Sequence, residues 1–472
     1  MPSAGSTTGE GMLTPVNQSA HVDVAVVGAG PTGATAALAF ARRGARVALI
    51  EGHPDAAKRF AGEWIHPPGV RTLRSLGIDV QALGARQGHG FAIFGGDGED
   101  PVCLPYDSGC SIARVHEELV FHLREHARGN SLVQYLPHHV FSELEGNTLH
   151  LHDRARDRHV SLRAGRIVGA DGRGSKVRAA LGGPVASEQL SYMAGLELED
   201  APLPFEGLGH VFLGGPGPAL LYRIDERRVR ACLDIPIACP TSARRSEAVY
   251  AAFCNALPAQ LEPSLRRAVA KPFSWASTGV RTRTFYGRDQ TWLAGDAIGH
   301  VHPLSGVGIT LGVMDAEAAA RTTSLEEYRR ERDAHVAEML ASVLYLAFSR
   351  TDASALRIRH GVLRMLRASA AERRRTMRLL TGDDRASTSF ADAFLRATGH
   401  VVLTGAESAV ARRQSWSEWA RQLRVDVGWL KWPLHAWAPA LGVISRRGAG
   451  SRQSVAAPTR SAKTTDEWRS LS

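Results

Sequence analysis

The sequence predicts an α/β protein in which a Rossmann-like domain is combined with a β-rich domain and a helical C-terminal region. An apolar run over 24–27 leads into a glycine-rich turn and then into an alanine-rich helical stretch. From 186 to 285 the pattern shifts to alternating strands, and from 326 to 445 it becomes helical. A chain of 472 residues, 44% of them hydrophobic, is long enough to form two or three domains with sizeable cores.

Three glycines, Gly28, Gly30 and Gly33, form a G-x-G-x-x-G motif between the first strand and the helix. Such glycines permit a tight turn, close approach of a pyrophosphate, and close packing of the helix on the strand. A second strand over 46–50 ends in Glu51, whose carboxylate can accept hydrogen bonds from a ribose. This order of strand, turn, helix, strand and acid predicts dinucleotide binding, with a glycine-rich turn in an ordinary α/β unit as the alternative.

Two later strands also run into glycine and aspartate. The first ends at Asp171, a sensible place to hold a ribose or a nicotinamide-linked group, and the second ends at Asp296, which can bind a ribityl hydroxyl. After Asp296, the helix start between Gly306 and Ile309 can direct the positive end of its dipole at the pyrimidine edge of a flavin. In both places a βα turn without a ligand is the alternative.

The loop after Glu51 combines charged, aromatic and imidazole side chains. Arg59 is a candidate cationic partner for a phosphate or for an anionic reduced flavin, and Trp64 and His66 follow it. Arg114, at the start of a later helix, can reach back to the phosphate or ribose of the same cofactor. Loops beside a cofactor usually carry function. For each arginine an ordinary surface or helix-flanking charge is the alternative.

The composition argues against several classes of protein. A net charge of +10 without a nucleic-acid-binding motif favours a solvated, arginine-rich surface over a nucleic-acid partner. The five cysteines are scattered and odd in number, which predicts reduced thiols with neither a disulfide framework nor a metal site. Residues 1–20 lack the apolar core of a signal peptide, and no apolar run is long enough for a transmembrane helix. We therefore expect a cytoplasmic protein.

The segment from 416 to 444 is rich in tryptophan, among leucines, prolines and flanking basic residues. One interpretation is an amphipathic segment that makes a peripheral contact with the cytoplasmic membrane face. The other is a C-terminal helix that covers the protein core. The pattern leaves both interpretations open.

Taken together, the three motifs resemble those of the para-hydroxybenzoate hydroxylase-like FAD monooxygenases and, within that group, the squalene epoxidases. The likeness spans roughly residues 22–320. Beyond the motifs, it lies in Glu51, Arg59, Gly62-Glu63, Pro67-Pro68-Gly69-Val70, Leu76-Gly77, the block from Pro218 to Ile235, and His302-Pro303-Leu304-Ser305-Gly306.

The residue patterns and the resemblance together assign the parts of the chain. The expected segments are an FAD-binding domain at 21–185 and 286–325, a β-sheet substrate domain at 186–285, a helical region at 326–445, and disordered tails at 1–20 and 446–472. The expected FAD contacts are Gly28, Gly30, Gly33, Glu51, Arg59, Trp64 through its backbone, Arg114, Asp171, Asp296, Gly306 and Ile309. Two residues depart from the family: its glutamine near flavin N5 is His66 here, and the tyrosine that supports that glutamine is Phe91.

The resemblance implies a monooxygenase in which bound FAD is reduced by NADH or NADPH, directly or through an electron-donor reductase. Reduced flavin and O₂ would form a C4a-hydroperoxide that epoxidises or hydroxylates a lipophilic substrate, such as a prenylated aromatic, a quinone or quinolone, a terpenoid or a polyketide of secondary metabolism. His66 is the candidate catalytic residue, hydrogen-bonded near N5 or O4. An FAD-dependent reductase or halogenase and an FAD-binding protein without turnover are the alternatives.

Overall fold

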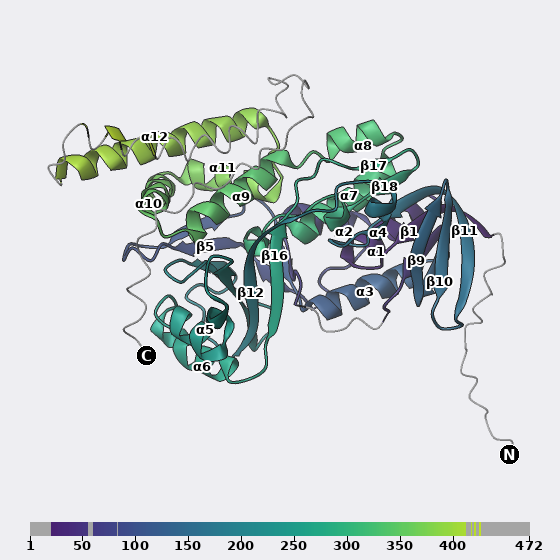
Figure 1. The fold of residues 1–472 in the computed structure, drawn as a ribbon, viewed down its shortest axis with the longest axis horizontal. Helices are drawn as coiled ribbons and strands as arrows, with labels where there is room; N and C mark the ends of the chain where they lie inside the picture. Colours follow the sequence, from purple (N-terminus) through teal and green to yellow (C-terminus); the bar gives the residue numbers. More distant parts are fainter. Residues whose placement is uncertain are drawn as a thin grey trace, which may run out of the picture. The chain divides into compact units, whose positions relative to one another are not determined.

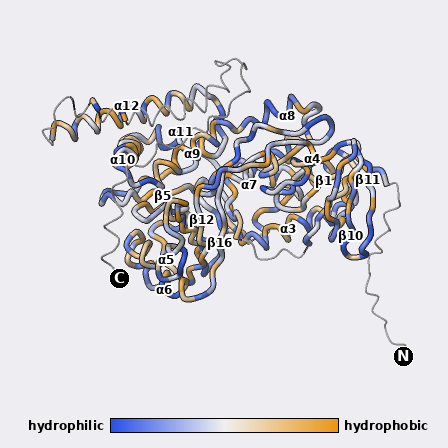
Figure 2. Tube along the Cα trace, in the orientation of Figure 1, coloured by the Kyte–Doolittle hydropathy of each residue, from blue (hydrophilic) through white to orange (hydrophobic). Residues whose placement is uncertain are grey.

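Two large β-sheets organise the part of the chain that the computed structural model describes, which comprises residues 20–54, 60–82 and 84–411 with residues 417, 420, 421, 424 and 425. Figure 1 shows the first sheet beside α1 and α7, and the second sheet beside α5 and α6. Hydrophobic residues are concentrated on the inner strands and helices, and hydrophilic residues in the outer loops (Figure 2).

The first sheet is mainly parallel and contains the strands that carry the predicted nucleotide motifs. In spatial order it holds β17 (Gly287–Arg288), β18 (Thr291–Leu293), β11 (Arg158–Gly169), β1 (Ala20–Val27), β2 (Val47–Glu51) and β8 (Val133–Pro137), with β10 (Thr148–Asp153) and β9 (His139–Glu145) attached through β11. Val22 and the residues from Val24 to Val27 of β1 are buried, as expected for a parallel strand in a sheet with covered faces. The helices α1 (Pro31–Ala41), α3 (His116–Arg128) and α7 (Gly308–Arg321) pack together beside it.

The second sheet has seven strands. They are, in spatial order, β16 (Ser274–Val280), β12 (Glu188–Glu199), β15 (Arg228–Pro236), β14 (Ala219–Arg223), β13 (Gly209–Phe212), β5 (Gly90–Phe94) and β6 (Val102–Pro105). The helices α5 (Ser246–Phe253) and α6 (Glu262–Val269) share a hydrophobic core with this sheet. Two strands that precede residue 186 in the chain thus belong to the β-rich part, because β5 pairs in parallel with β13.

The remaining elements before α7 are short. A small sheet contains β3 (Trp64–Ile65), β7 (Ser111–Ala113) and β4 (Arg86–Gly88). The short helices are α2 (Pro67–Ser75), α4 (Lys176–Ala180), η1 (Thr241–Arg244), η2 (Ala259–Leu261), η3 (Gly295–Ala297) and η4 (Pro303–Ser305). Both β3 and α2 belong to the loop region that the sequence singled out after Glu51.

Helices follow the second sheet, as the periodicity predicts. They are α8 (Leu325–Glu331), α9 (His335–Ser349), α10 (Ala353–Ala368), α11 (Ala370–Thr381) and α12 (Ser387–Ala411). None of the helices among the described residues is long and apolar enough to cross a membrane. Arg59 and the tryptophans of the segment 416–444 lie outside the described residues, so both interpretations of that segment stay predictions. The α/β class with a β-rich part and C-terminal helices is confirmed.

Candidate functional site

The carboxyl ends of the parallel strands meet at one edge of the first sheet. Val27, the last residue of β1, is paired with Ile50 of β2 and with Gly169 of β11, and Gly169 is paired with Leu293 of β18. The segments that follow these strands carry Gly28, Glu51, Asp171 and Asp296, so the register brings all of the predicted acids and the glycine motif to the same edge. In open α/β sheets, ligands bind at this edge.

The glycine motif has the close approaches that the sequence predicts. The backbone of Gly28 has a φ of +97°, in the left-handed region, and a Cβ at Gly33 would lie 1.7 Å from the carbonyl oxygen of Gly28. A Cβ at Gly30, by contrast, would have no atom of the described residues within 4 Å. Gly30 is also the N-cap of α1, where helix N–H groups have no intrahelical partner. This open, dipole-positive surface fits a pyrophosphate.

Glu51 is held in place by an arginine that sequence reasoning missed. Its Oε2 accepts hydrogen bonds from the Ala29 N–H at 2.9 Å and from Arg124 Nη2 at 2.8 Å. The Nε of Arg124 also donates to the Ala29 carbonyl, at 2.7 Å. Arg124 lies one helical turn from the buried Val120 and Ala127 of α3, so its position on the inner helix face was the available signal. Arg124 therefore joins Glu51 beside the glycine motif.

Arg114, the predicted arginine, has other partners. Its Nη1 donates to the Gly84 carbonyl at 3.0 Å, and its guanidinium forms an ion pair with Glu118 in the first turn of α3, the helix that begins two residues after Arg114. Its backbone N–H donates to the Glu63 carbonyl at 3.1 Å, which fixes the loop before β3. The proposed contact of Arg114 with the cofactor stays a prediction, and the contacts of the structure favour Arg124 for that position.

The two carboxylate oxygens of Asp171 have different surroundings. Its Oδ2 accepts the backbone N–H groups of Lys176 and Val177, at 2.7 and 3.1 Å, and so holds the first turn of α4. Its Oδ1 is buried and has no hydrogen-bond partner within the described part of the chain. Because a buried acceptor without a partner is costly, this oxygen marks a place where a bound group can donate a hydrogen bond.

Asp296 follows β18 and lies in the short helix η3. Its Oδ2 accepts a hydrogen bond from Arg173 Nε at 3.2 Å, and a third of its side chain is exposed. Farther along, Gly306 has a φ of +63° and α7 begins two residues later, at Gly308. Ile309 in the first turn lies against the loop after Glu51, because a Cβ at Gly62 would come within 3.2 Å of its side chain. A Cβ at Gly308 would lie 4.0 Å from Asp296 Oδ1, so Asp296 lies beside the start of α7, and the start of α7 lies beside that loop.

His66 lies at the N-terminus of α2 and is fully buried. Its Nε2 is 2.9 Å from the carbonyl oxygen of Ser305, which can only accept, so Nε2 carries the proton. Its Nδ1 therefore accepts from the hydroxyl of Tyr106, at 2.8 Å. Burial lowers the pKa of His66 to about 4, although the Ser305 carbonyl acts in the opposite direction, so the ring is neutral at pH 7.

Tyr106 supplies a hydroxyl to His66, at a place where the resemblance implies that the family's supporting hydroxyl is replaced by Phe91. It follows β6 directly, and its oxygen also accepts a hydrogen bond from Trp64 Nε1 at 3.1 Å. Burial raises the pKa of the Tyr106 hydroxyl well above its ordinary value, so it stays protonated and can donate to His66. Phe91 packs against both Trp64 and His66, with ring centroids 5.1 and 5.8 Å apart. The supporting hydroxyl is thus present, but it comes from the neighbouring strand.

A buried ion pair ties this loop to the second sheet. Arg230 of β15 donates to both carboxylate oxygens of Glu63, from Nε at 2.9 Å and from Nη2 at 2.7 Å. The hydroxyl of Tyr222 donates to the same carboxylate at 3.1 Å. Burial alone would lower the pKa of Arg230, but the hydrogen bonds and charge of Glu63 raise it above its ordinary value. The loop is therefore fixed on both sides, by Glu63 to the second sheet and by His66 to Ser305.

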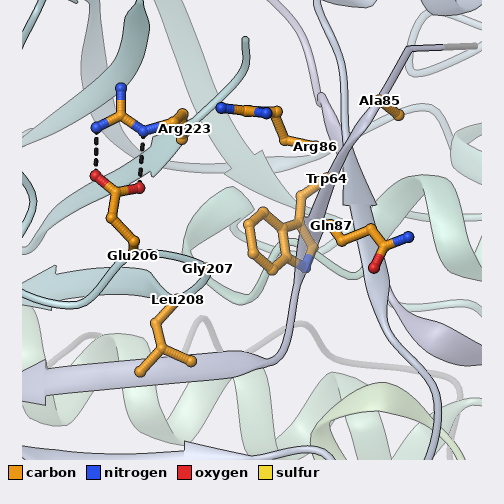
Figure 3. A pocket seen from close by; sticks show the side chains of 8 residues that line it. All are labelled: Trp64, Ala85, Arg86, Gln87, Glu206, Gly207, Leu208 and Arg223. Carbon is orange, nitrogen blue, oxygen red and sulfur yellow. Dashed lines mark hydrogen bonds and ion pairs between the residues drawn. The ribbon is translucent and has the colours of Figure 1, made fainter. Parts of the chain in front are cut away.

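A cavity of about 410 Å³ opens beside Trp64, between the small sheet and the turn before β13. Figure 3 shows the indole facing Leu208 and Gln87, with the pair of Arg223 and Glu206 at the far side. A second cavity of about 280 Å³ lies beside Tyr106 and α11, lined in part by Met377 and Thr381. Both cavities thus border residues that hold His66 or the loop around it.

The fold and this edge of the sheet define a dinucleotide-binding protein of the Rossmann class, with an open helix N-terminus at Gly30 and open carboxylate oxygens at Asp171 and Asp296. Comparison with known proteins specifies the dinucleotide. The chain matches the family model described as "FAD binding domain" over residues 21–341, which is more than half of its length, and it belongs to that family.

Relatives and solved structures agree with this assignment. Squalene monooxygenase of Mus musculus is 27% identical over 393 residues, covering 75% of this chain and 67% of the mouse protein. Squalene epoxidase 3 of Arabidopsis thaliana is 30% identical over 323 residues, covering 65% of this chain and 60% of the plant protein. The chain is an FAD-dependent monooxygenase similar to squalene epoxidases, as the sequence motifs predict.

The solved structures share the fold. The p-nitrophenol 4-monooxygenase PnpA of Pseudomonas putida superposes with a TM-score of 0.62 at 20% identity, over 80% of this chain and 98% of that one. PqsL of Pseudomonas aeruginosa, described as a probable FAD-dependent monooxygenase, gives a TM-score of 0.56 at 22% identity, over 79% and 99%. At these identities the likeness concerns the fold, and FAD as the cofactor is confirmed by the family.

Proposed function

We propose that this monooxygenase uses NADH or NADPH and O₂ to epoxidise or hydroxylate a lipophilic molecule. The observation that carries the proposal is the convergence of Gly30, Asp296 and the start of α7 at one edge, beside an aromatic cluster formed by Trp64 and Phe91. The similarity to squalene monooxygenases, whose name states a lipophilic substrate, supports the same conclusion.

The residues that would hold FAD follow from the geometry. Gly28 and Gly30 would take the pyrophosphate, and Glu51 with Arg124 would take the adenosine side. Asp296 would accept from the ribityl chain, and the start of α7 would stabilise negative charge on the flavin ring by its dipole. When bound, FAD supplies the two-electron acceptor for the nicotinamide and the group that activates O₂. The remaining task of the protein is to orient the reactants and to exclude water.

For His66 we propose a positioning role. Both ring nitrogens already have partners, Ser305 and Tyr106, so a hydrogen bond to the flavin would require the loss of one of them. As a neutral donor, His66 instead fixes the Ser305 carbonyl and with it the backbone that leads into Gly306. The electrostatics at this point are then those of a dry, uncharged site, which suits an apolar substrate.

Substrate and electron donor are open to a direct test. The protein is purified with FAD, and O₂ uptake and NAD(P)H oxidation are measured with squalene and with a panel of prenylated aromatics, quinolones and polyketides. Substrate-stimulated O₂ uptake and a product carrying one added oxygen atom are expected. Product formation without O₂ would identify a reductase instead, and halide incorporation would identify a halogenase. Activity that appears only with an added flavin reductase would assign electron supply to a partner protein.

A further inference from the structure

A second cluster of buried polar side chains lies behind the loop 302–306, outside the set of predicted FAD contacts. It consists of Ser191 of β12, Asp234 of β15, Thr278 of β16, His302 before η4, and Tyr345 of α9. All five are buried, with the side chains of Asp234 and His302 at 0% exposure. Segments of the second sheet, the FAD-binding part and the C-terminal helices thus meet in one cluster, in which Ser191, His302 and Tyr345 contact the Asp234 carboxylate and Thr278 contacts Ser191 and His302.

Asp234 and His302 form the centre of the cluster, and each polar atom of their side chains has a hydrogen-bond partner. Asp234 Oδ1 accepts from His302 Nε2 at 3.1 Å and from the hydroxyl of Ser191, and Oδ2 accepts from the hydroxyl of Tyr345 at 3.0 Å. The Tyr345 ring stacks on the imidazole, with centroids 3.7 Å apart. The Nδ1 of His302 accepts the backbone N–H of Leu304 at 3.2 Å, so the proton of this ring is on Nε2.

Serine, histidine and aspartate in contact suggest a nucleophile, but the geometry is wrong for one. In a Ser-His-Asp triad the carboxylate and the serine contact opposite nitrogens of the imidazole. Here Ser191 Oγ and Asp234 Oδ1 both lie 3.1 Å from the same atom, His302 Nε2. The other nitrogen is used by the backbone of Leu304. The cluster therefore cannot relay a proton from serine to aspartate. Its function lies in the backbone turn that His302 holds in place.

His302 holds the turn that leads to the cofactor edge. Its Nδ1 caps η4, and its carbonyl accepts from Ser305 Oγ at 3.3 Å. The Ser305 carbonyl in turn accepts from His66 Nε2 at 2.9 Å, and the left-handed Gly306 follows before α7. A continuous series of hydrogen bonds therefore runs from Asp234 in the second sheet, through His302, to the backbone between His66 and the start of α7.

We propose that Asp234 is a positioning residue for the cofactor loop, acting through His302 to set the backbone of residues 302–306. The proposal rests on the FAD site proposed above. It explains why a carboxylate is buried at this place: its acceptor oxygen fixes the tautomer of His302 that leaves Nδ1 free to cap Leu304. It also makes α9, through Tyr345, part of the support of the FAD site.

The decisive variant is His302→Asn, because it separates capping from tethering. Asparagine is a preferred N-cap residue, so it can still accept the Leu304 N–H, but it is too short to reach Asp234. FAD affinity is measured by the fluorescence of flavin titrated with apoprotein, and the visible absorption and circular dichroism of the bound flavin are recorded. We expect the Kd for FAD to rise about tenfold, which corresponds to the loss of about 1.4 kcal/mol, and the flavin dichroism to change.

Asp234→Asn and the double variant test whether the two residues act through one contact. If they do, the double variant binds FAD no more weakly than the weaker of the single variants. Asp153→Asn is the matched control, since Asp153 is equally buried but lies at the end of β10, hydrogen-bonded to Arg156 and Arg158. It should leave the Kd for FAD and the flavin spectra unchanged, even if it lowers the melting temperature.

Two results would overturn the proposal. One is a lowered melting temperature in His302→Asn with the wild-type Kd for FAD and wild-type flavin spectra, which would make the cluster a stabilising contact only. The other is a double variant whose effects on Kd multiply, which would mean that the two residues act independently. Neither readout depends on turnover, so a failed search for substrate would count against the proposed function and not against this inference.

Discussion

Removing Arg230 tests how strongly the loop after Glu51 depends on its buried ion pair. In Arg230→Met, the carboxylate of Glu63 would keep its bond from Tyr222 but lose two charge-assisted hydrogen bonds, of 2.9 and 2.7 Å. The side chain of Glu63 is only 2% exposed, so water cannot replace the arginine. Breaking a buried pair by removing one partner costs about 3–5 kcal/mol, and we expect a loss of unfolding free energy of this size.

The assay is urea denaturation of the apoprotein, followed by tryptophan fluorescence and by far-ultraviolet circular dichroism. The double variant Glu63→Met/Arg230→Met should recover most of the loss, because it leaves no unpaired charge. Arg227→Met is the control, since Arg227 pairs with Asp200 at the surface and is 74% exposed, and it should not move the midpoint. An Arg230→Met midpoint equal to that of Arg227→Met, or a double variant less stable than the single one, would refute the reasoning.

A lowering of the pH and four further substitutions probe the site itself. Lowering the pH from 6.5 towards 4 should destabilise the protein, since the unfolded imidazole of His66 binds a proton that the folded one, with a pKa of about 4, does not. His66→Gln should lack this part of the loss, about 3 kcal/mol near pH 4 in denaturation curves. Tyr106→Phe leaves Trp64 Nε1 and His66 Nδ1 without partners. Tyr106→Phe should lower the free energy of unfolding by about 1–3 kcal/mol. It should also raise the amount of H₂O₂ formed per NAD(P)H oxidised, measured by a peroxidase assay. Gly30→Ala should leave the stability of the apoprotein near that of the wild type, since its Cβ would meet no atom of the described part of the chain within 4 Å. The same Cβ would occupy the space proposed for the pyrophosphate, so the Kd for FAD, measured by fluorescence titration, should rise about tenfold. Gly33→Ala should yield no folded protein, because its Cβ would lie 1.7 Å from a carbonyl oxygen.

The variants His66→Gln, Tyr106→Phe and Gly30→Ala each have an outcome that would contradict the reasoning behind them. If His66→Gln keeps the full acid destabilisation, the relevant group is another buried histidine, such as His210 or His300, whose pKa burial also lowers to about 4. If Tyr106→Phe forms no more H₂O₂ per NAD(P)H than the wild type, the hydrogen bond from Tyr106 to His66 has no effect on the reaction with oxygen. Wild-type FAD affinity in Gly30→Ala would move the pyrophosphate away from the glycine motif.

The sequence is most informative where the chemistry is local. Strand, glycine turn and helix follow one another within a few residues at Gly28, and strand, glycine and acid do so at Asp296. Parallel pairing then brings such strand ends together without further information, because carboxyl ends share one edge of the sheet. The fold class and dinucleotide binding can therefore be predicted from short motifs and their order along the chain, and the resemblance of the three motifs to a known family adds FAD.

Contacts between distant segments could not be predicted in this way. β5 pairs with β13, and Phe91 of β5 lies opposite Gly209 of β13, although more than a hundred residues separate the two in the sequence. The resemblance to the epoxidases indicates that Phe91 removes a supporting hydroxyl. The antiparallel pairing of β5 with β6 instead places Tyr106 beside His66, and periodicity alone contains no signal for that exchange between strands. Arg124 differs, since its helical spacing is visible in the sequence, although the prediction named Arg114.

The hydrogen bonds around the loop also bear on how a change in the second sheet would reach a bound flavin. Glu63 is held by Arg230 of β15, and four residues farther along the same strand Asp234 holds His302. One strand of the second sheet therefore contacts both sides of the site, the loop before α2 through Glu63 and the turn before α7 through His302. A shift of β15 along its axis would move both sides together, and it would leave the glycine motif, which is packed on the first sheet, where it is. On this arrangement, substitutions in β15 should alter the flavin ring environment more than the affinity for the adenosine half.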